Sequence, residues 1–176
     1  MNCFRAHFAP ALLHLMILLC ATTWTGCAGY KVGPVTKTPY HSVAVPMFKN
    51  RTLMPQLEAQ VTNALIKRFQ QDGSLAVRSS DDSDIVLTGE IIRYDRRMIR
   101  SQRYDTTVPA EMRLTIEARI EAHDRVTGKT VLAPTVVSGS ADTFLGTDQQ
   151  SAEQLALPLI ADDLAKRAVS LIVEGW

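Results

Sequence analysis

Residues 110 to 124, AEMRLTIEARIEAHD, alternate polar and apolar side chains without a break from Glu111 to His123. The apolar positions are Met112, Leu114, Ile116, Ala118, Ile120 and Ala122. A period of two residues indicates a β-strand with one buried face and one face in water, as in antiparallel sheets. This strand constrains the fold most, because its apolar face must be covered by another layer.

Two segments carry the helical periodicity that such a covering layer requires. In residues 55 to 71 the apolar stripe is Leu57, Val61, Ala64, Leu65 and Phe69, and Gly73 follows where a helix C-cap is expected. In residues 151 to 176 the stripe is Leu157, Ile160, Ala161, Leu164, Ala168, Leu171 and Ile172. Pro158 either starts this second helix or kinks a longer one, because it donates no N–H to the carbonyl of Gln154.

Four further segments are predicted to be strands: SVAVPMFKN (42–50), LAVRS (75–79), DIVLTGEIIRYDR (84–96) and TVLAPTVVSGSADTF (130–144). The first two flank the first helix, so this β-α-β unit is expected to be parallel. Gly89 indicates a bulge or a close approach of the backbone, and Pro134 marks an edge strand or a bulge. The sequence predicts an α+β fold, with two amphipathic helices packed on one face of a mixed four- to five-stranded sheet.

The first 26 residues have the features of a secretory signal peptide. Arg5 and His7 precede a short apolar run, FAPALLHLMILLCA, which Pro10 and His14 interrupt. A retained membrane anchor is the alternative, but a spanning helix needs about 20 apolar residues. We therefore expect residues 1–26 to be removed from the mature protein.

Cys27 is the one cysteine that follows this signal segment. The sequence around it, TTWTGCAG, is similar to a bacterial lipobox, in which the cysteine is acylated and becomes the new N-terminus. Trp24 departs from the leucine-like residue that is usual there, and Ala28 favours the outer membrane as destination. We expect a lipid-anchored chain, with a tether over residues 27–40 and a single domain over residues 41–176.

The sequence contains no motif typical of a catalytic or metal site. His41 and His123 are far apart and have no cysteine or carboxylate neighbours at ligand spacing, so neither a metal nor a cofactor is expected. The nucleophile and base that a hydrolase needs are also missing, so the protein is not expected to be an enzyme. A formal net charge of +1 gives no reason to expect binding to nucleic acid.

The most conspicuous polar cluster is IIRYDRRMIRSQRYD, residues 91–105, in which tyrosine, methionine and isoleucine separate five arginines. The arginines are Arg93, Arg96, Arg97, Arg100 and Arg103. Guanidinium groups bind phosphate through paired hydrogen bonds, and the apolar neighbours suit acyl or sugar surface. One interpretation is a site for a phosphorylated amphiphile or an acidic partner surface. The other is a solvated connection whose charges keep a sheet edge soluble.

The order of these segments resembles the LptE family of lipopolysaccharide (LPS) assembly lipoproteins. The similar pieces are GCAGYKV, SVAVPMFKNRT, LEAQVTNALIKRF, SDIVLTGEIIRYD, AEMRLTIEARIEAHDRVTGK and a final helix ending in EGW. They run through nearly all of residues 27 to 176. The resemblance implies a non-enzymatic lipoprotein on the periplasmic face of the outer membrane. Such a protein plugs the β-barrel translocon LptD, helps it assemble and contacts LPS.

The resemblance also implies positions for these two contacts. A basic loop between central strands is implicated in LPS binding in the family. The residues that correspond to it by position are Arg96, Arg97, Arg100 and Arg103. Arg113, Glu117 and Arg119, on the wet face of the long strand, are candidates for contact with the barrel wall, because mixed charge suits a polar lumen.

A second family resemblance leaves an alternative function open. SVAVPMFKN followed by a helix is also similar to periplasmic lipoproteins related to CsgG and to activators of peptidoglycan synthases. CsgG-like pores need long alternating segments that build a membrane barrel, and the chain has no room for them. The alternative is therefore a lipoprotein that regulates a peptidoglycan synthase or another envelope complex.

Overall fold

The computed structural model describes residues 39–101, 103–104, 109–145 and 148–174. The chain divides into two units, residues 1–33 and 34–176, and all described residues belong to the second. The elements are β1 (Ser42–Ala44), β2 (Lys49–Asn50), α2 (Leu57–Asp72), β3 (Ala76–Val77), β4 (Ile85–Ser101), β5 (Pro109–Asp124), β6 (Thr130–Phe144) and α3 (Gln149–Glu174). The signal segment, Cys27 and most of the tether lie outside the described residues.

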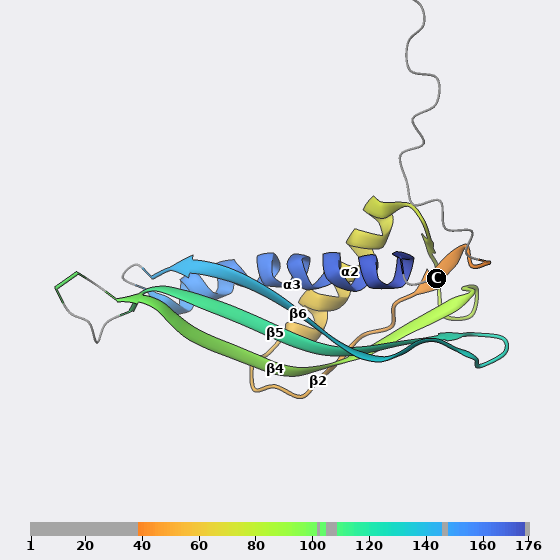
Figure 1. Ribbon diagram of the computed structural model, residues 1–176, viewed down its shortest axis with the longest axis horizontal. Coiled ribbons are helices and arrows are strands. Elements are labelled where there is room, and N and C mark those ends of the chain that lie inside the picture. Colours follow the sequence, from red (N-terminus) through yellow and green to blue (C-terminus); the bar gives the residue numbers. More distant parts are fainter. Residues whose placement is uncertain (1–38, 102, 105–108, 146–147, 175–176) are drawn as a thin grey trace, which may run out of the picture. The chain divides into compact units, whose positions relative to one another are not determined.

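In the described part of the chain, six strands form one mixed sheet (Figure 1). The order is β3-β1-β4-β5-β6, and β2 also pairs with β4. β1 lies parallel to β3 and β4, which confirms the predicted β-α-β unit, and β4, β5 and β6 are antiparallel. The sheet has six strands rather than four or five, because Lys49–Asn50 forms a separate short strand parallel to Glu90 and Ile91.

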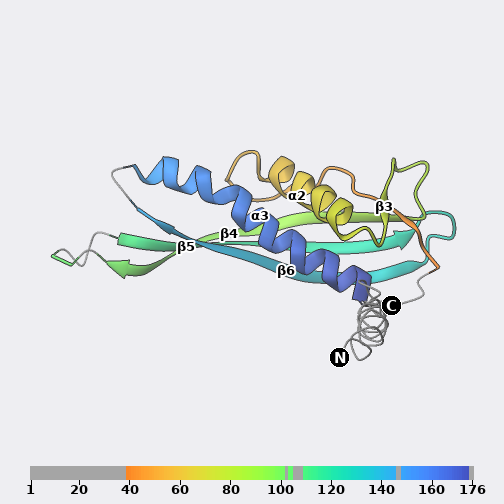
Figure 2. The same ribbon diagram turned by 90° about the horizontal axis from the view of Figure 1, so that it is seen from above.

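The two helices cover one face of this sheet and leave the other face open, as the views in Figures 1 and 2 show from two directions. The helical residues that bury their side chains include Leu57, Val61, Leu65, Phe69, Leu157, Ile160, Leu164 and Ile172. They pack with the apolar face of β5, whose Leu114, Ile116 and Ile120 are fully buried. The predicted two-layer α+β arrangement is confirmed.

The helix ends and the proline also follow the sequence. Gly73 ends α2 in the left-handed conformation, with φ +75°, and its N–H donates to the carbonyl of Phe69 at 3.0 Å. Pro158 lies inside α3 and does not start it. The longer-helix alternative is therefore the correct one, and the carbonyl of Gln154 loses its usual donor.

Two glycines permit close packing between layers. A Cβ atom at Gly139 in β6 would lie 2.4 Å from the carbonyl oxygen of Ile160 and 2.5 Å from the nitrogen of Leu164. A Cβ atom at Gly89 would lie 2.1 Å from the ring of Phe48. Both distances are far below a normal contact, so glycine lets α3 approach β6 and lets the Phe48 ring lie on β4. Close approach at Gly89 was one of the two expected alternatives.

Asp84 ties the start of β1 to the start of β4. Its carboxylate accepts the backbone N–H groups of His41 and Ser42 at 2.8 and 2.9 Å, and its own N–H donates to the Ser42 hydroxyl at 2.9 Å. These hydrogen bonds, led by that from His41 and followed by that with the Ser42 hydroxyl, lower the pKa of Asp84. The ionised carboxylate therefore stabilises this end of the sheet.

Candidate functional site

The face of the sheet opposite the helices carries a ladder of charges along β4 and β5. The odd-numbered residues of β5 point to this face, because the even-numbered residues from Met112 to Ala122 are buried. Arg93 Nη1 lies 3.7 Å from Glu117 Oε1, and Arg100 Nε lies 3.7 Å from Glu111 Oε2. Most charges on this helix-free face are thus matched across neighbouring strands.

Arg113 forms a two-point ion pair on the helix-free face. Its Nε and Nη2 donate to the two carboxylate oxygens of Asp142 in β6, at 2.7 and 2.8 Å. The hydrogen bond and the charge of Asp142 raise the pKa of Arg113, and the same contact lowers the pKa of Asp142. Arg113 is therefore held in place towards β6.

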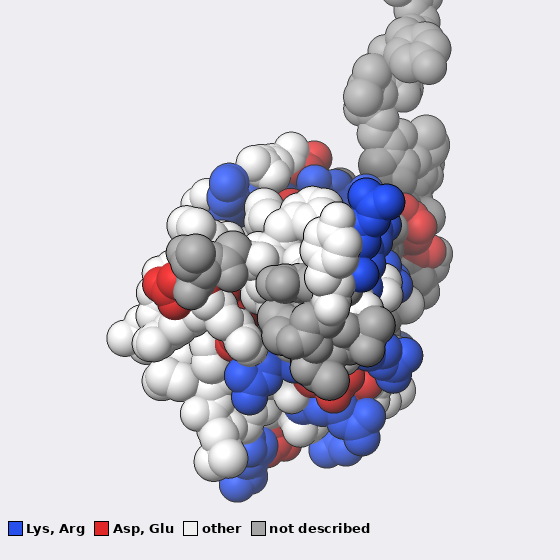
Figure 3. Space-filling view, turned by 90° about the vertical axis from the view of Figure 1, so that its left-hand side faces the viewer, with Lys and Arg blue, Asp and Glu red and all other residues white. Residues whose placement is uncertain are grey.

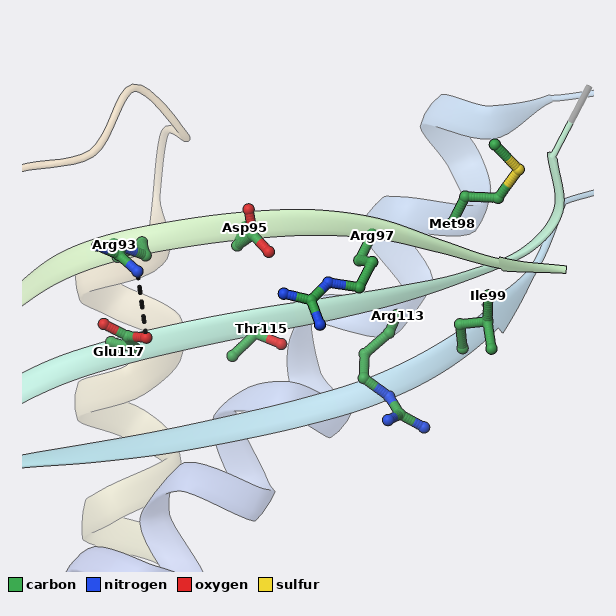
Figure 4. Close-up of a pocket in the computed structure, with 8 residues that line it drawn as sticks. All are labelled: Arg93, Asp95, Arg97, Met98, Ile99, Arg113, Thr115 and Glu117. Atoms are coloured by element: carbon green, nitrogen blue, oxygen red, sulfur yellow. Dashed lines mark ion pairs between the residues drawn. The ribbon is translucent and has the colours of Figure 1, made fainter. Parts of the chain in front are cut away.

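Arg97 lacks a partner of this kind. The strand register places it directly opposite Arg113, and no described residue forms a hydrogen bond or ion pair with its side chain. Figure 4 shows its side chain reaching across β5 towards Thr115. Like charges opposite each other disfavour the strand pairing. Asp142 offsets the charge of Arg113, so Arg97 is the guanidinium that an added anion would neutralise.

The space beside Arg97 is a depression of about 250 Å³ on the helix-free face (Figure 4). It is lined by Arg93, Asp95, Arg97, Met98, Ile99, Arg113, Thr115 and Glu117. Ile99 is 46% exposed and lies on the same side of β4 as Arg97, so apolar surface adjoins the guanidinium groups (Figure 4). In the end-on view of Figure 3, basic side chains recur along the lower edge, with acidic and uncharged surface between them. This combination suits an anion that carries apolar groups.

Arg96, the neighbour of Arg97, lies on the helix side of β4. Its Nη1 contacts both carboxylate oxygens of Glu153 in α3, at 3.2 and 3.4 Å, and its guanidinium lies 6.0 Å from the centre of the Tyr94 ring. Glu153 is only 6% exposed and also accepts hydrogen bonds from Tyr94 at 3.5 Å and Gln149 at 2.9 Å. The structure therefore separates Arg96 from Arg97 and uses it to join α3 to the sheet.

The Tyr94 hydroxyl belongs to the same buried network. Burial and, after it, the negative charge of Glu153 raise the pKa of Tyr94 to about 12. The phenol consequently stays protonated at neutral pH and can donate to Glu153. This arrangement keeps the Glu153 carboxylate partnered beneath α3.

Most of the predicted basic loop is strand. β4 continues to Ser101 and contains Arg96, Arg97 and Arg100, whereas Arg103 lies beyond its end and is exposed. The pairing extends because β4 and β5 still match apolar positions there, with Tyr94 opposite Ile116 and Met98 opposite Met112. Residues 102 and 105–108 lie outside the described part of the chain.

The three candidates for barrel contact lie on the helix-free face, as the alternation predicts. Arg113 pairs with Asp142, Glu117 pairs with Arg93, and Arg119 stands opposite Glu90. The position of Arg113 opposite Arg97 can be predicted only if the pairing register of β4 and β5 is known. The sequence alone does not give this register, because it depends on the length of the connection and on the irregularity between Met98 and Arg100.

The two histidines occupy separate places. The His41 backbone donates to Asp84, and His123 Nε2 lies 3.7 Å from Glu121 Oε2. Among the residues that the structure describes, no group of three or more His, Cys, Asp or Glu side chains is placed to hold a metal ion. Neither described helix combines the length and the apolar character that crossing a bilayer requires.

Comparison with known proteins gives a family and a fold. The model of the LptE family, described as lipopolysaccharide-assembly, matches residues 40–172. A Xanthomonas campestris structure has a TM-score of 0.57 and 13% identity, with 81% of this chain and 91% of that chain covered. A hypothetical protein from Chlamydia trachomatis has a TM-score of 0.52 and 11% identity, with 76% of this chain and 95% of that chain covered. A minor lipoprotein from Acinetobacter baumannii has a TM-score of 0.51 and 14% identity, with 77% of this chain and 94% of that chain covered. No curated protein matches the sequence significantly.

Proposed function

Because the chain belongs to the LptE family of lipopolysaccharide-assembly proteins, we propose that it is a non-enzymatic outer-membrane lipoprotein that plugs the LptD β-barrel translocon. It helps the barrel to assemble and contacts LPS on the way to the cell surface. The family supports a place in lipopolysaccharide assembly. The charged, helix-free face of the sheet supports a contact with an anionic ligand such as LPS.

The observation that carries this proposal is the unpaired side chain of Arg97, which the strand register places opposite Arg113. Arg97 is unpartnered among the described residues, and Arg113 is oriented by Asp142. A phosphate group of LPS between them would receive charge-assisted hydrogen bonds from two guanidinium groups. Acyl or sugar surface would then lie against Ile99 beside it.

The other predicted LPS residues take different parts in this proposal. Arg100 and Arg103 continue the basic surface towards the end of the sheet, and Arg100 is weakly paired with Glu111 at 3.7 Å. Arg96 supports the site through Glu153 and does not touch the ligand. The LPS contact is therefore centred on the second half of β4.

The helix-free face is also the proposed contact with the barrel. Further along β5 from the depression, Glu117 and Arg119 alternate in sign and face Arg93 and Glu90. Such mixed charge matches the polar interior of a membrane barrel better than lipid. Arg113 is also a candidate for this contact, and it stands opposite Arg97 in the strand register.

Cys27 provides the proposed attachment to the membrane. Removal of residues 1–26 would leave it as the acylated N-terminus, and residues 27–40 would form the tether. Two or more acyl chains hold a protein stably on a bilayer, whereas one chain gives reversible binding. The folded domain, proposed to span residues 41–176, would then act from the periplasmic face of the outer membrane.

The test is LPS binding by Arg97→Ala, measured by titration of the full chain in detergent. A charge-assisted hydrogen bond contributes about 1.5–3 kcal/mol, so affinity should fall about tenfold or more. Arg78→Ala is the matched control, because Arg78 is an exposed arginine that pairs with Asp82 before β4 begins. Equal affinities of the two variants would remove the basis for the site.

A further inference from the structure

The edge of β4 that faces away from β5 is open along its second half. On this side β1 pairs with residues 85–86 and β2 with residues 90–91. The N–H of Arg51 then donates to the carbonyl of Ile91 at 3.0 Å. From Arg93 to Ser101, β4 has no strand neighbour on this side among the described residues. A row of unpaired backbone groups is a template for another strand.

A pocket of about 400 Å³ adjoins this open edge where the chain leaves β2. Arg51, Arg93 and Arg96 line it, their side chains are 68%, 66% and 53% exposed, and no acidic side chain is part of the lining. Leu53 and Met54 supply apolar surface, and Leu53 is fully exposed. Each of the three arginines also pairs with a glutamate outside the lining, namely Glu90, Glu117 and Glu153, and each stays more than half exposed. The pocket therefore offers basic groups beside apolar surface and adjoins the unpaired backbone.

We propose that this edge binds an extended, acidic segment of a protein partner, which adds to β4 as a strand where β2 ends. The peptide backbone pairs with β4 from Arg93 onward, an apolar side chain contacts Leu53 and Met54, and a carboxylate lies over the arginines. A peptide fits better than a lipid, because only a polypeptide offers the regular row of donors and acceptors that the strand edge lacks.

The other long edge of the sheet is protected, which leaves β4 as the edge for a partner. In β6 the N–H of Ser140 donates to Asp163 of α3 at 3.0 Å, and Arg167 holds Asp163 at 3.1 Å. Pro134 lies within the same strand, where it donates no backbone N–H. A covering side chain and a proline are both devices that prevent edge pairing. Within the described residues, the second half of β4 has neither a proline nor a covering side chain.

Hydrogen exchange of the full chain tests this proposal with two synthetic peptides, one of alternating valine and glutamate and one of alternating valine and lysine. At millimolar concentration, the glutamate peptide should slow exchange severalfold at those amides of residues 93 to 100 that point away from β5, and the lysine peptide should not. Leu53→Asp places a negative charge at the pocket and should abolish the protection. Val126→Asp, the same kind of change at a 76% exposed turn position, should retain it.

The remaining outcomes contradict the proposal. Protection by neither peptide, equal protection by both, or protection that survives Leu53→Asp would exclude an acidic strand at this edge. Protection by LPS micelles without protection by the glutamate peptide would assign the edge to lipid. LPS affinity of Leu53→Asp should remain at the wild-type level, because Arg97 and Arg113 are untouched. A negative result for the peptide-binding edge can thus be distinguished from a negative result for the LPS site.

Discussion

At the residue scale, the structure gives two adjacent arginines opposite roles. Arg97 lies on the helix-free face without a described partner, whereas Arg96 lies beneath α3 against Glu153. The period of two in a strand places neighbours on opposite faces. The sequence identifies the basic cluster, but it does not divide it, because Glu153 lies 57 positions away from Arg96.

Stability should distinguish Arg96→Ala from Arg97→Ala. Loss of Arg96 leaves the buried Glu153 without its cation and should lower the free energy of unfolding by about 1–3 kcal/mol. Loss of Arg97 removes a like-charge contact with Arg113 and should leave stability unchanged or raise it by about 0.2–1 kcal/mol. Urea denaturation of both variants measures the difference. Equal destabilisation by the two changes would contradict the assigned faces.

Asp84 should make part of the stability depend on pH. Its pKa is lowered from 3.8 in the folded protein, so the unfolded chain takes up this proton more readily than the folded one. The stabilisation is present above the unfolded pKa and is lost as the pH falls through the lower folded pKa. Asp84→Asn should therefore flatten the decline of the unfolding free energy below about pH 4. Asp81→Asn changes an exposed neighbouring carboxylate and should keep the wild-type decline of the unfolding free energy. If Asp81→Asn flattened this decline as much as Asp84→Asn does, the special role of Asp84 would be contradicted.

At the scale of elements, periodicity predicts most of the fold and misses its irregular parts. The alternation in β5 and the stripes of both helices correctly identify the buried faces. β2 is missed as a separate strand, because two residues show no period. The second half of β4 is taken for a loop, because polar and apolar residues no longer alternate cleanly where only part of the strand is covered. The same half of β4 contains Arg97, so its position opposite Arg113 is missed as well.

Gly139→Ala tests the contact between α3 and β6. The added Cβ would meet backbone atoms of Ile160 and Leu164 at 2.4 and 2.5 Å, so the helix must move away from the strand. Overpacking of this kind costs about 1–3 kcal/mol, which thermal or urea unfolding would detect. Ser138→Ala is the control, because Ser138 stands opposite Glu117 on the helix-free face. A Gly139→Ala variant as stable as the control would refute the close packing.

At the scale of the whole molecule, two helices cover one face of the sheet and leave the charged face free. A domain that only needed a stable core would gain nothing from a ladder of matched charges, since exposed ion pairs contribute little to stability. The ladder instead provides a polar surface that can fit a polar lumen and, at Arg97, an anion. A lipid anchor would hold this surface near its partner.

Cys27→Ser tests the anchor. The hydroxyl cannot take the thioether-linked lipid, so the variant should lose incorporation of labelled palmitate and remain unprocessed or leave the outer-membrane fraction. Cys20→Ser, within the signal segment, should keep both properties. Full fractionation of the Cys27→Ser variant with the outer membrane would show that acylation at this position is not the attachment.

The most direct test of the proposed function is purification of the tagged full chain from detergent-solubilised outer membrane. We expect a β-barrel of the LptD type to copurify together with LPS, and Arg97→Ala to retain the barrel while losing most of the LPS. Recovery of a penicillin-binding protein in place of the barrel would contradict the proposed function and favour regulation of a peptidoglycan synthase.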